Sequence, residues 1–142
     1  MEPFRTTLPV RSDDLDVNGH VRGDAYLTYG DHARWECLWA AGIDPAALAA
    51  RGIGPVNLET TLRFRGELRA GEAVEVVTTF DWGPGKTSRV RQELRTAAGA
   101  VAAEIESVSG LLDLGLRRLV PDPARHWREL ARHPELLGLA GD

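Results

Sequence analysis

The strongest constraint on the fold is a two-residue alternation of apolar and polar side chains that runs through most of residues 56–114. In a β-strand, successive side chains point to opposite faces of the sheet, so each alternating run predicts a strand with one buried and one solvated face. The four predicted strands are residues 56–64, 74–82, 89–95 and 101–114. Short turn-like segments such as residues 69–72 separate them, which indicates that successive strands pair antiparallel as a meander.

The two faces of this predicted sheet differ in chemistry. In the first run one face is expected to hold Val56, Leu58, Thr60, Leu62 and Phe64. The opposite faces of the later runs carry charged residues, among them Arg89, Arg91, Glu104 and Glu106. We expect most of these charges to form cross-strand pairs on a solvated face, although the cations of residues 61–95 could also hold phosphate groups.

Residues 24–41 change to the period of a helix. Small or apolar residues recur at alternating spacings of three and four, at Tyr26, Gly30, Ala33, Cys37 and Ala41. We expect Asp24 to cap the start of this helix and Gly42 to follow its end. The small side chains of the stripe would let the helix approach the predicted sheet closely.

The remaining segments complete one domain over residues 1–142. Residues 4–11 predict a strand before the long helix, residues 44–51 a short helix capped by Asp44, and residues 121–137 a short helical tail. The predicted fold class is α+β, with one long helix packed on an antiparallel sheet of about five strands. One helix covers only one face of such a sheet, so we expect the other face to be solvated or to meet another subunit.

Composition excludes several classes of function. Lysine and arginine total 17 against 21 aspartates and glutamates, a net charge of −4, so no nucleic-acid partner is expected. Cys37 is the single cysteine, which rules out an internal disulfide and a cysteine-based zinc cluster, and we expect it to be a packed thiol rather than a nucleophile. The first residues lack a signal-peptide pattern and no apolar run reaches the length of a membrane span, so we expect a cytoplasmic protein with no membrane partner, metal or cofactor.

The segment RSDDLDVNGHVRGD, residues 11–24, crowds four carboxylates, an asparagine and a histidine before the long helix. Its middle matches the opening of a calcium-binding EF-hand loop, but Ala25 stands where that loop needs a bidentate glutamate. Calcium binding is therefore not expected. Turn formation and satisfaction of the free amides at the helix start account for Asp13, Asp14 and Asp24.

Asp16 and His20 fit a turn-forming role less well and suggest acyl-transfer chemistry. A histidine beside the positive end of a helix is electrostatically unfavourable, so its presence needs another explanation. The free amides of a helix N-terminus can hold a developing oxyanion, while a carboxylate a few residues earlier acts as base or nucleophile on the same carbonyl. His20 adds a group that can move a proton near neutral pH.

The order of these motifs resembles the hotdog-fold thioesterases of the 4-hydroxybenzoyl-CoA thioesterase type. The resemblance covers residues 4–120: a strand, the pattern D-x-D-x-x-G-H-V, a helix with Y-L-x-Y and A-R-W-E, and four antiparallel strands. The string DLDVNGHV is also similar to the D-x-N-x-H segment of acyl-ACP thioesterases, which aligns Asp16, Asn18 and His20 with that motif. RFRGEL resembles the segment that carries a further acidic residue in that family, here Glu67, and GKTS resembles a turn found in acyl-CoA hotdog enzymes.

The resemblance implies that Asp16 is the nucleophile or general base and that amides near Arg22, Gly23 and Asp24 polarise the thioester carbonyl. It also implies a homodimer or homotetramer with the site between subunits, and no metal. The family usually has two asparagines where this chain has Arg22 and Gly23, so the side chains that line the pocket differ. Arg22 is then either a substrate contact or an exposed side chain.

The predicted function is hydrolysis of an acyl thioester, with acyl-CoA favoured over acyl-ACP as substrate. Two alternatives stay open: dehydration of a β-hydroxyacyl thioester, which is another hotdog chemistry, and non-catalytic acyl binding. The candidate catalytic residues are Asp16, Asn18, His20 and Glu67. An exposed turn residue is the alternative interpretation of Glu67. Arg69 and Lys86, both at turns, are candidates to bind the phosphates of coenzyme A.

Overall fold

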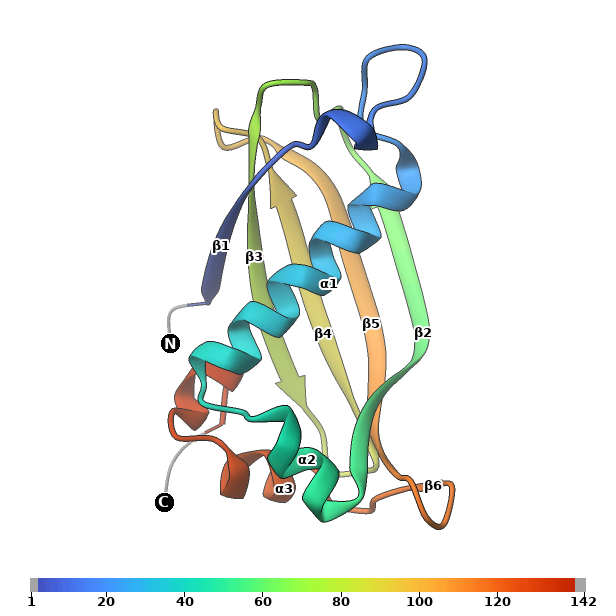
Figure 1. Cartoon of the computed structure of the whole chain (residues 1–142), viewed down its shortest axis with the longest axis vertical. Coiled ribbons are helices and arrows are strands. Elements are labelled where there is room, and N and C mark those ends of the chain that lie inside the picture. Colours follow the sequence, from blue (N-terminus) through green and yellow to red (C-terminus); the bar gives the residue numbers. More distant parts are fainter. Residues whose placement is uncertain (1–2, 140–142) are drawn as a thin grey trace.

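The computed structural model describes residues 3–139 as two layers, an antiparallel sheet and one long helix that crosses it (Figure 1). The strands are β1 (Phe4–Pro9), β2 (Ile53–Phe64), β3 (Ala73–Trp82), β4 (Thr87–Arg95), β5 (Val101–Asp113) and β6 (Arg118–Leu119). The helices are α1 (Gly23–Ala40), α2 (Pro45–Arg51) and α3 (Pro123–Leu130), with short 3-10 turns η1 (Ser12–Asp14) and η2 (Pro134–Leu137). This arrangement confirms the predicted α+β class, with one long helix on a sheet of five main strands.

The strand order is β1-β3-β4-β5-β2, with the short β6 paired to the end of β5, and every pairing is antiparallel. The predicted meander is right for β3, β4 and β5 but wrong for β2, which pairs with β5 instead of β3. Residues 65–72 do not form a hairpin, because they carry the chain across the end of the sheet from β2 to β3 (Figure 1). β2 therefore forms an open edge of the described sheet.

The predicted faces of β2 are wrong for the residues before Leu58, because the strand contains a β-bulge there. The pairing with β5 shifts between Asn57 and Glu59, so Leu58 is an extra residue in the strand. Asn57 consequently lies opposite Ser109 on the side that faces α1, and Val56 turns to the outer side. The rest of the strand keeps the predicted alternation. Periodicity alone could not predict the reversal at Val56 and Asn57, because a bulge reverses the faces of the residues before it without changing the sequence pattern.

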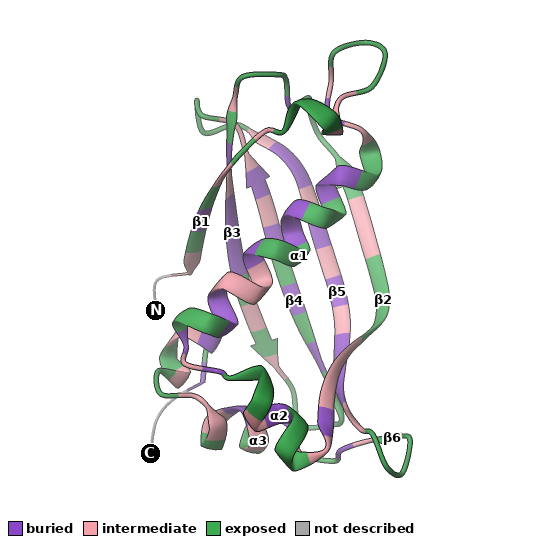
Figure 2. Cartoon of the chain, viewed as in Figure 1, coloured by how far each residue is buried: buried purple, intermediate pink, exposed green. Residues whose placement is uncertain are grey.

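Helix α1 lies across the sheet, and buried and exposed positions alternate along it (Figure 2); Gly30, Ala33 and Cys37 are among the buried ones. Ala33 and Cys37 are fully buried. A Cβ added at Gly30 would come within 2.8 Å of the side chains of Gln92 and Ile105. The close approach predicted from this stripe is therefore confirmed, and a larger residue at position 30 requires its neighbours to move.

The ends of the helices follow local capping signals. Gly42 comes directly after the cap of α1 and has the positive φ of +86° that favours glycine after a helix, as predicted. Asp44 caps α2, also as predicted, since its carboxylate accepts the amide N–H of Ala46 at 2.9 Å. The prediction that Asp24 caps α1 is wrong. The helix begins at Gly23, so Asp24 lies in the first turn, where its charge still faces the positive helix end.

The C-terminal segment closes one end of the core. α3 buries Trp127, which is 7% exposed. The indole N–H of Trp82 donates to the carbonyl oxygen of Leu137 at 2.7 Å, which ties η2 to the end of β3. These residues pack with Cys37 and Leu111 in one core cluster, while a second cluster lies under the N-terminal half of α1. The tail thus packs as part of the same core.

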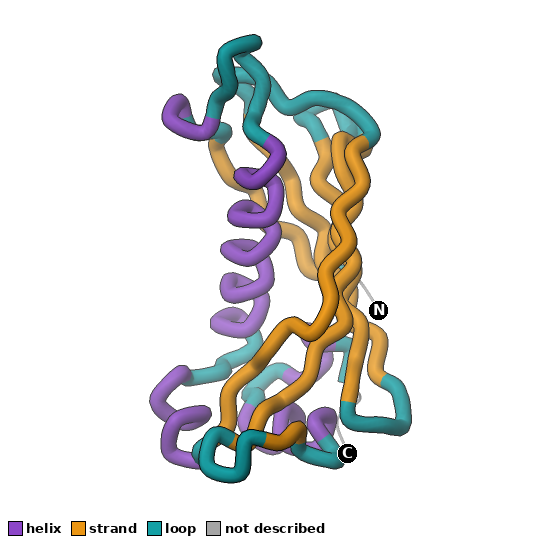
Figure 3. The backbone as a smooth tube through the Cα atoms, turned by 90° about the vertical axis from the view of Figure 1, so that its right-hand side faces the viewer, coloured by secondary structure: helices purple, strands orange, loops and turns teal. Residues whose placement is uncertain are grey.

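The face of the sheet away from α1 is charged, and Figure 3 shows α1 on the other side. Arg89 pairs with Glu106 at 2.6 Å, and Arg91 pairs with Asp81 at 3.3 Å. These contacts confirm the predicted cross-strand pairs. Exposed ion pairs contribute about 0–1 kcal/mol each, so they keep this face solvated rather than hold the sheet together.

Candidate active site

The segment between β1 and α1 forms a small hairpin that projects from one end of the sheet (Figure 1). Leu15 and Val21 form an isolated antiparallel bridge, and the amide N–H of Asp16 donates to the carbonyl oxygen of His20 at 2.7 Å. The side chain of Val17, at the tip, is fully exposed. The hairpin places Asp16 and His20 opposite each other, directly before the start of α1.

The carboxylate of Asp16 is held by backbone donors. Its Oδ1 accepts the amide N–H of His20 at 3.1 Å and that of Asn18 at 2.8 Å. Hydrogen bonds to a carboxylate favour its charged form, so these two donors, His20 above all, lower the pKa of Asp16 below its ordinary value. The Asp16 side chain is also exposed. It therefore offers a charged, accessible oxygen at neutral pH.

The crossing segment between β2 and β3 brings Glu67 to this hairpin. His20 and Arg69 form an isolated antiparallel bridge, and the amide N–H of Val21 donates to the carbonyl oxygen of Leu68 at 2.9 Å. His20 Nε2 lies 3.2 Å from Glu67 Oε2, and the Arg69 guanidinium lies 3.2 Å from the same oxygen. The structure thus brings the predicted acidic residue and one predicted phosphate contact together with the predicted histidine.

The start of α1 supplies two amide donors beside the hairpin. In the described part of the chain the N–H groups of Gly23 and Asp24 have no acceptor, as is usual in the first turn of a helix. A Cβ added at Gly23 would lie 3.2 Å from the ring of Phe64, so a larger residue would crowd this point. The helix dipole adds partial positive charge here, which suits a developing oxyanion.

The other charged groups of the segment hold it in shape. The guanidinium of Arg22 reaches Asp24 at 3.2 Å and Asp14 at 3.5 Å, and the hydroxyl of Tyr29 donates to Asp14 at 2.8 Å. Asp13 pairs with a neighbouring arginine at 2.9 Å. These contacts support the structural interpretation of the three aspartates. The guanidinium of Arg22 therefore forms ion pairs with carboxylates of its own segment.

Two of the predicted residues stand apart from the cluster. Asn18 lies exposed in the hairpin, where its backbone N–H serves Asp16 and its side chain has no hydrogen bond to residues 3–139. Lys86 lies in the turn between β3 and β4, at the other end of the sheet from Arg69. The ten residues of β3 separate those ends by about 33 Å. Arg69 and Lys86 of one chain therefore cannot hold the same phosphate group.

Sequence reasoning missed a second polar group, which lies beneath the middle of α1. Gln92 of β4 and Ser109 of β5 face the helix and are 6% and 3% exposed. Arg34 of α1 donates to Ser109 and to Asn57. One signal was available in the sequence, since a glutamine in the middle of the inward face of β4 breaks an otherwise apolar pattern.

Cys37 is buried in the core beneath α1. Burial raises the pKa of the Cys37 thiol to about 12, so it stays neutral, and the expected packed thiol is confirmed. Within residues 3–139 no three histidine, cysteine or carboxylate side chains gather as ligands for a metal ion. Over the same range no helix is both long enough and apolar enough to cross a membrane.

The family is settled by comparison of the whole sequence with known families. Residues 10–132 match the profile of the thioesterase-like superfamily. The chain belongs to this superfamily. The match covers the hairpin, the long helix and all of the main sheet except β1, so it confirms the resemblance drawn from the motifs. Thioester hydrolysis is the activity that it supports at the level of the family.

Solved structures share the hotdog architecture. A hypothetical protein from Thermus thermophilus matches with a TM-score of 0.77 at 28% identity, over 89% of this chain and 95% of its own. A hypothetical protein from Staphylococcus aureus, solved in complex with CoA, matches with a TM-score of 0.78 at 17% identity, over 91% and 85%. The 12:0-ACP thioesterase from Umbellularia californica matches with a TM-score of 0.78 at 20% identity, over 89% of this chain and 48% of its own. These similarities confirm the predicted hotdog fold.

Proposed function

We propose that this protein hydrolyses acyl thioesters with Asp16 as nucleophile or general base. Membership of the superfamily supports thioester hydrolysis in general, and one observation supports the choice of residues. Asp16, His20 and Glu67 form a single cluster beside the free amides at the start of α1. Acyl transfer needs a charged carboxylate, a group that moves protons and donors for an oxyanion, and this cluster contains all three.

In the proposed reaction the thioester carbonyl oxygen accepts hydrogen bonds from the amides of Gly23 and Asp24. Asp16 either takes a proton from a water molecule that attacks the carbonyl carbon, or attacks that carbon itself to form an anhydride that water then hydrolyses. In both routes the carbon–sulfur bond breaks and the leaving thiolate receives a proton from His20. The products are a carboxylic acid and a thiol, and proton exchange with water restores both side chains.

Glu67 has a positioning role in this proposal. Its Oε2 lies next to Nε2 of His20 and so fixes the orientation of the imidazole ring. Arg69 contacts the same oxygen and holds the carboxylate in turn. Neither residue contacts the reacting atoms in this scheme, because both act through the position of His20.

We further propose that a second copy of this chain completes the site, in a homodimer or homotetramer. Asp16 and Val17 are open to water in the single chain, whereas acyl transfer benefits when water is excluded. The open edge strand β2 exposes 52% of Leu58 and 56% of Phe64. Phe64 also packs beside Gly23, so a subunit bound along this edge would cover the amide donors.

Acyl-CoA is the proposed substrate, with acyl-ACP as the second carrier to test. Proteins of this fold include one solved with CoA and one named as an acyl-ACP thioesterase. Arg69 lies at the cluster and is 66% exposed at its side chain, so it can approach a phosphate of either carrier. Lys86 could reach such a carrier only from another subunit, because it lies at the opposite end of the sheet from the cluster.

The proposal is tested by thiol release from a panel of acyl-CoA and acyl-ACP thioesters. We expect the wild-type protein to release thiol and Asp16→Asn to be slower by about hundredfold or more, because the amide cannot act as base or nucleophile. Asparagine keeps an oxygen for the two backbone N–H groups, so the hairpin should be preserved. Asp13→Asn, in the same segment, is the matched control and should keep its activity.

Three outcomes would overturn the proposal. Equal rates for the wild-type protein and Asp16→Asn would remove Asp16 from the chemistry. Reversible hydration of an enoyl thioester without thiol release would indicate a dehydratase. Tight acyl-CoA binding without turnover on any chain length or carrier would indicate an acyl-binding protein.

A further inference from the structure

Helix α1 crosses the sheet diagonally and begins on the side of the edge strand β2 (Figure 1). A cavity of about 260 Å³ lies between α1, β2 and the inner strands, and we refer to it as the α1–β2 groove. Its walls are apolar at Leu27 and Ile105 and polar at Thr60, Gln92 and Ser107. Such mixed walls suit an acyl group with a polar substituent better than a plain hydrocarbon chain.

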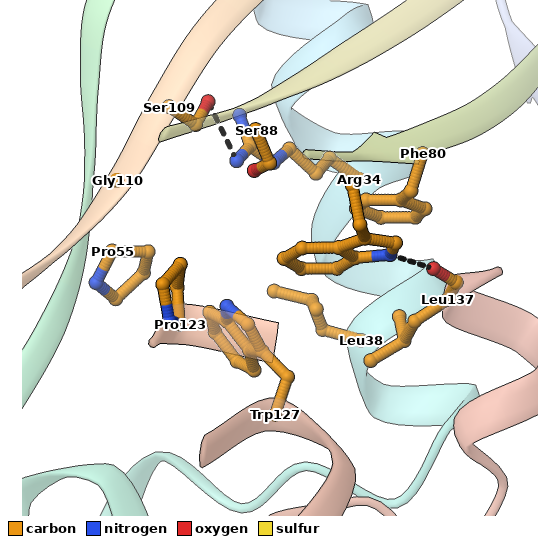
Figure 4. Close-up of a pocket in the computed structure, with 11 residues that line it drawn as sticks. Arg34, Leu38, Pro55, Phe80, Ser88, Ser109, Gly110, Pro123, Trp127 and Leu137 are labelled. Carbon is orange, nitrogen blue, oxygen red and sulfur yellow. Dashed lines mark hydrogen bonds between the residues drawn. The ribbon is translucent and has the colours of Figure 1, made fainter. Parts of the chain in front are cut away.

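Arg34 forms the inner end of this groove. Its side chain donates from Nη1 to Asn57 Oδ1 at 2.7 Å and from Nη2 to Ser109 Oγ at 3.0 Å. Figure 4 shows the guanidinium beside Ser109 and Ser88, where Arg34 also lines a smaller enclosed cavity toward α3. A guanidinium has five N–H groups, so three stay available after these two bonds.

The Arg34 guanidinium has no counter-ion in the described part of the chain. Both of its hydrogen-bond partners are neutral oxygens, and no carboxylate lies within ion-pair distance. Arginines on the outer face differ, since Arg89 and Arg91 both pair with carboxylates. Burial penalises a charge that is not neutralised, and it lowers the pKa of Arg34 below its ordinary value. A half-buried cation without a counter-ion, at the end of a cavity, can bind an anion.

We propose that the α1–β2 groove binds the acyl group and that Arg34 binds a carboxylate at its far end, so that the substrates are monothioesters of dicarboxylic acids. This inference rests on the proposed hydrolysis and adds the substrate class. A hydroxyl group would accept a hydrogen bond but leave the charge of Arg34 uncompensated. A carboxylate neutralises it and can pair with the guanidinium through two parallel hydrogen bonds.

The groove runs along α1 from Leu27 to Arg34, and Leu27 lies about one helical turn after Gly23 at the proposed reaction centre. Gly23 packs on Phe64 and Arg34 bonds to Asn57, and both of these β2 residues face α1. Arg34 is eleven residues after Gly23 along the helix, a rise of roughly 16 Å. An acyl chain with its thioester carbonyl at the start of α1 can therefore pass Leu27 and place its other end at Arg34.

Asp31 also lines the groove but does not neutralise Arg34. It lies almost one helical turn earlier on α1, is exposed, and forms no ion pair with the guanidinium. Its charge raises the pKa of Arg34 and so opposes the effect of burial. It would also repel a second anion at the solvent side, which favours an acyl group with a single carboxylate.

The test compares CoA thioesters of equal chain length that differ only at the far end, from succinyl against butyryl to dodecanedioyl against lauroyl. We expect the wild-type protein to favour the carboxylated member of at least one pair by about tenfold or more in kcat/KM, as for a charge-assisted hydrogen bond. In Arg34→Gln the ratio should fall to about one through slower turnover of the carboxylated substrate alone. Arg34→Lys keeps the charge and should retain part of the preference.

Controls separate recognition from a structural role. Arg34→Gln should fold, because Ser109 Oγ and Asn57 Oδ1 remain bonded to each other at 2.8 Å, and circular dichroism checks this. Arg91→Gln removes the same charge from the outer face and should leave the ratio unchanged. Equal losses on both members of every pair would show that Arg34 only braces α1 against β2, and would overturn the proposal.

Binding measurements distinguish a failure of this proposal from a failure of the proposed hydrolysis. Calorimetry uses non-hydrolysable amide analogues of one carboxylated and one neutral acyl-CoA. Tighter binding of the carboxylated analogue by the wild-type protein, but not by Arg34→Gln, supports the anion site even if no thioester is cleaved. Equal binding of the two analogues, or no binding of either, overturns the anion site, while thiol release from neutral substrates would still support hydrolysis.

Discussion

His20 and Glu67 meet at 3.2 Å although they belong to separate segments, so their contact can be tested residue by residue. We expect His20→Ala to lower kcat by about hundredfold, because it removes the proposed proton donor. Glu67→Gln should lower kcat by about tenfold with little change in KM, because it removes only the group that orients the imidazole. Steady-state kinetics on one acyl-CoA measure both variants.

A double variant of His20 and Glu67 tests whether Glu67 acts through His20 or independently of it. If Glu67 acts through His20, adding Glu67→Gln to His20→Ala should cause no further loss. Glu36→Gln is the matched control, because Glu36 forms a similar exposed pair with His32 on α1 at 2.9 Å, and it should leave kcat unchanged. Losses that multiply in the double variant would contradict the positioning role.

Residues of the site that lie close together in the sequence could be predicted, whereas residues that only the fold brings together could not. Asp16 and His20 could be identified from the sequence because both precede one helix within a few residues, and local charge patterns show such a site. Glu67 entered only through the family resemblance, because its contact with His20 depends on where the chain crosses the sheet. Arg34 and Asn57 were missed because the bulge that turns Asn57 inward leaves no trace in the alternation.

At the scale of the elements, α3 depends on one buried tryptophan. Trp127 is 7% exposed, whereas Trp39 on α1 is 53% exposed, so the two residues form a matched pair. We expect Trp127→Ala to lower the free energy of unfolding by about 3–5 kcal/mol, because it leaves a cavity in the core. Trp39→Ala should lower it by less than about 1 kcal/mol. Urea unfolding followed by circular dichroism measures both, and equal losses would contradict the packing of α3.

Most elements could be predicted from the sequence, but their pairing could not. Periodicity and capping residues predict α1, α2 and the five main strands to within a few residues, because those signals are local. Residues 69–72 have the composition of a hairpin turn, yet the chain crosses the sheet there. The crossing is determined by β1 and β5, which occupy the places beside β3 and β2, and a local pattern does not contain that information.

At the scale of the whole molecule, the open edge at β2 is the proposed contact between two chains. Leu58→Lys adds a charge to this edge and should convert the oligomer to a monomer and lower hydrolysis by about tenfold or more, without loss of secondary structure. Leu116, which is 70% exposed in the turn between β5 and β6, provides the control, since Leu116→Lys should change neither property. Light scattering measures the mass.

A wild-type monomer at micromolar concentration would contradict the shared site. So would a Leu58→Lys variant that keeps both its oligomeric state and its activity. Loss of activity in a variant that is still oligomeric would place Leu58 in the site itself and not in the contact between chains.

The pairing of β2 with β5 also determines when this protein can fold during its synthesis. α1 and β2 leave the ribosome before residues 73–113, which form the strands on which both must pack. The nascent chain therefore carries a helix with an uncovered apolar side and a strand with no partner until β5 has emerged. We therefore expect native pairing of β2 to form only after β5 has emerged, and the first half of the chain to be accessible to chaperones and proteases until then.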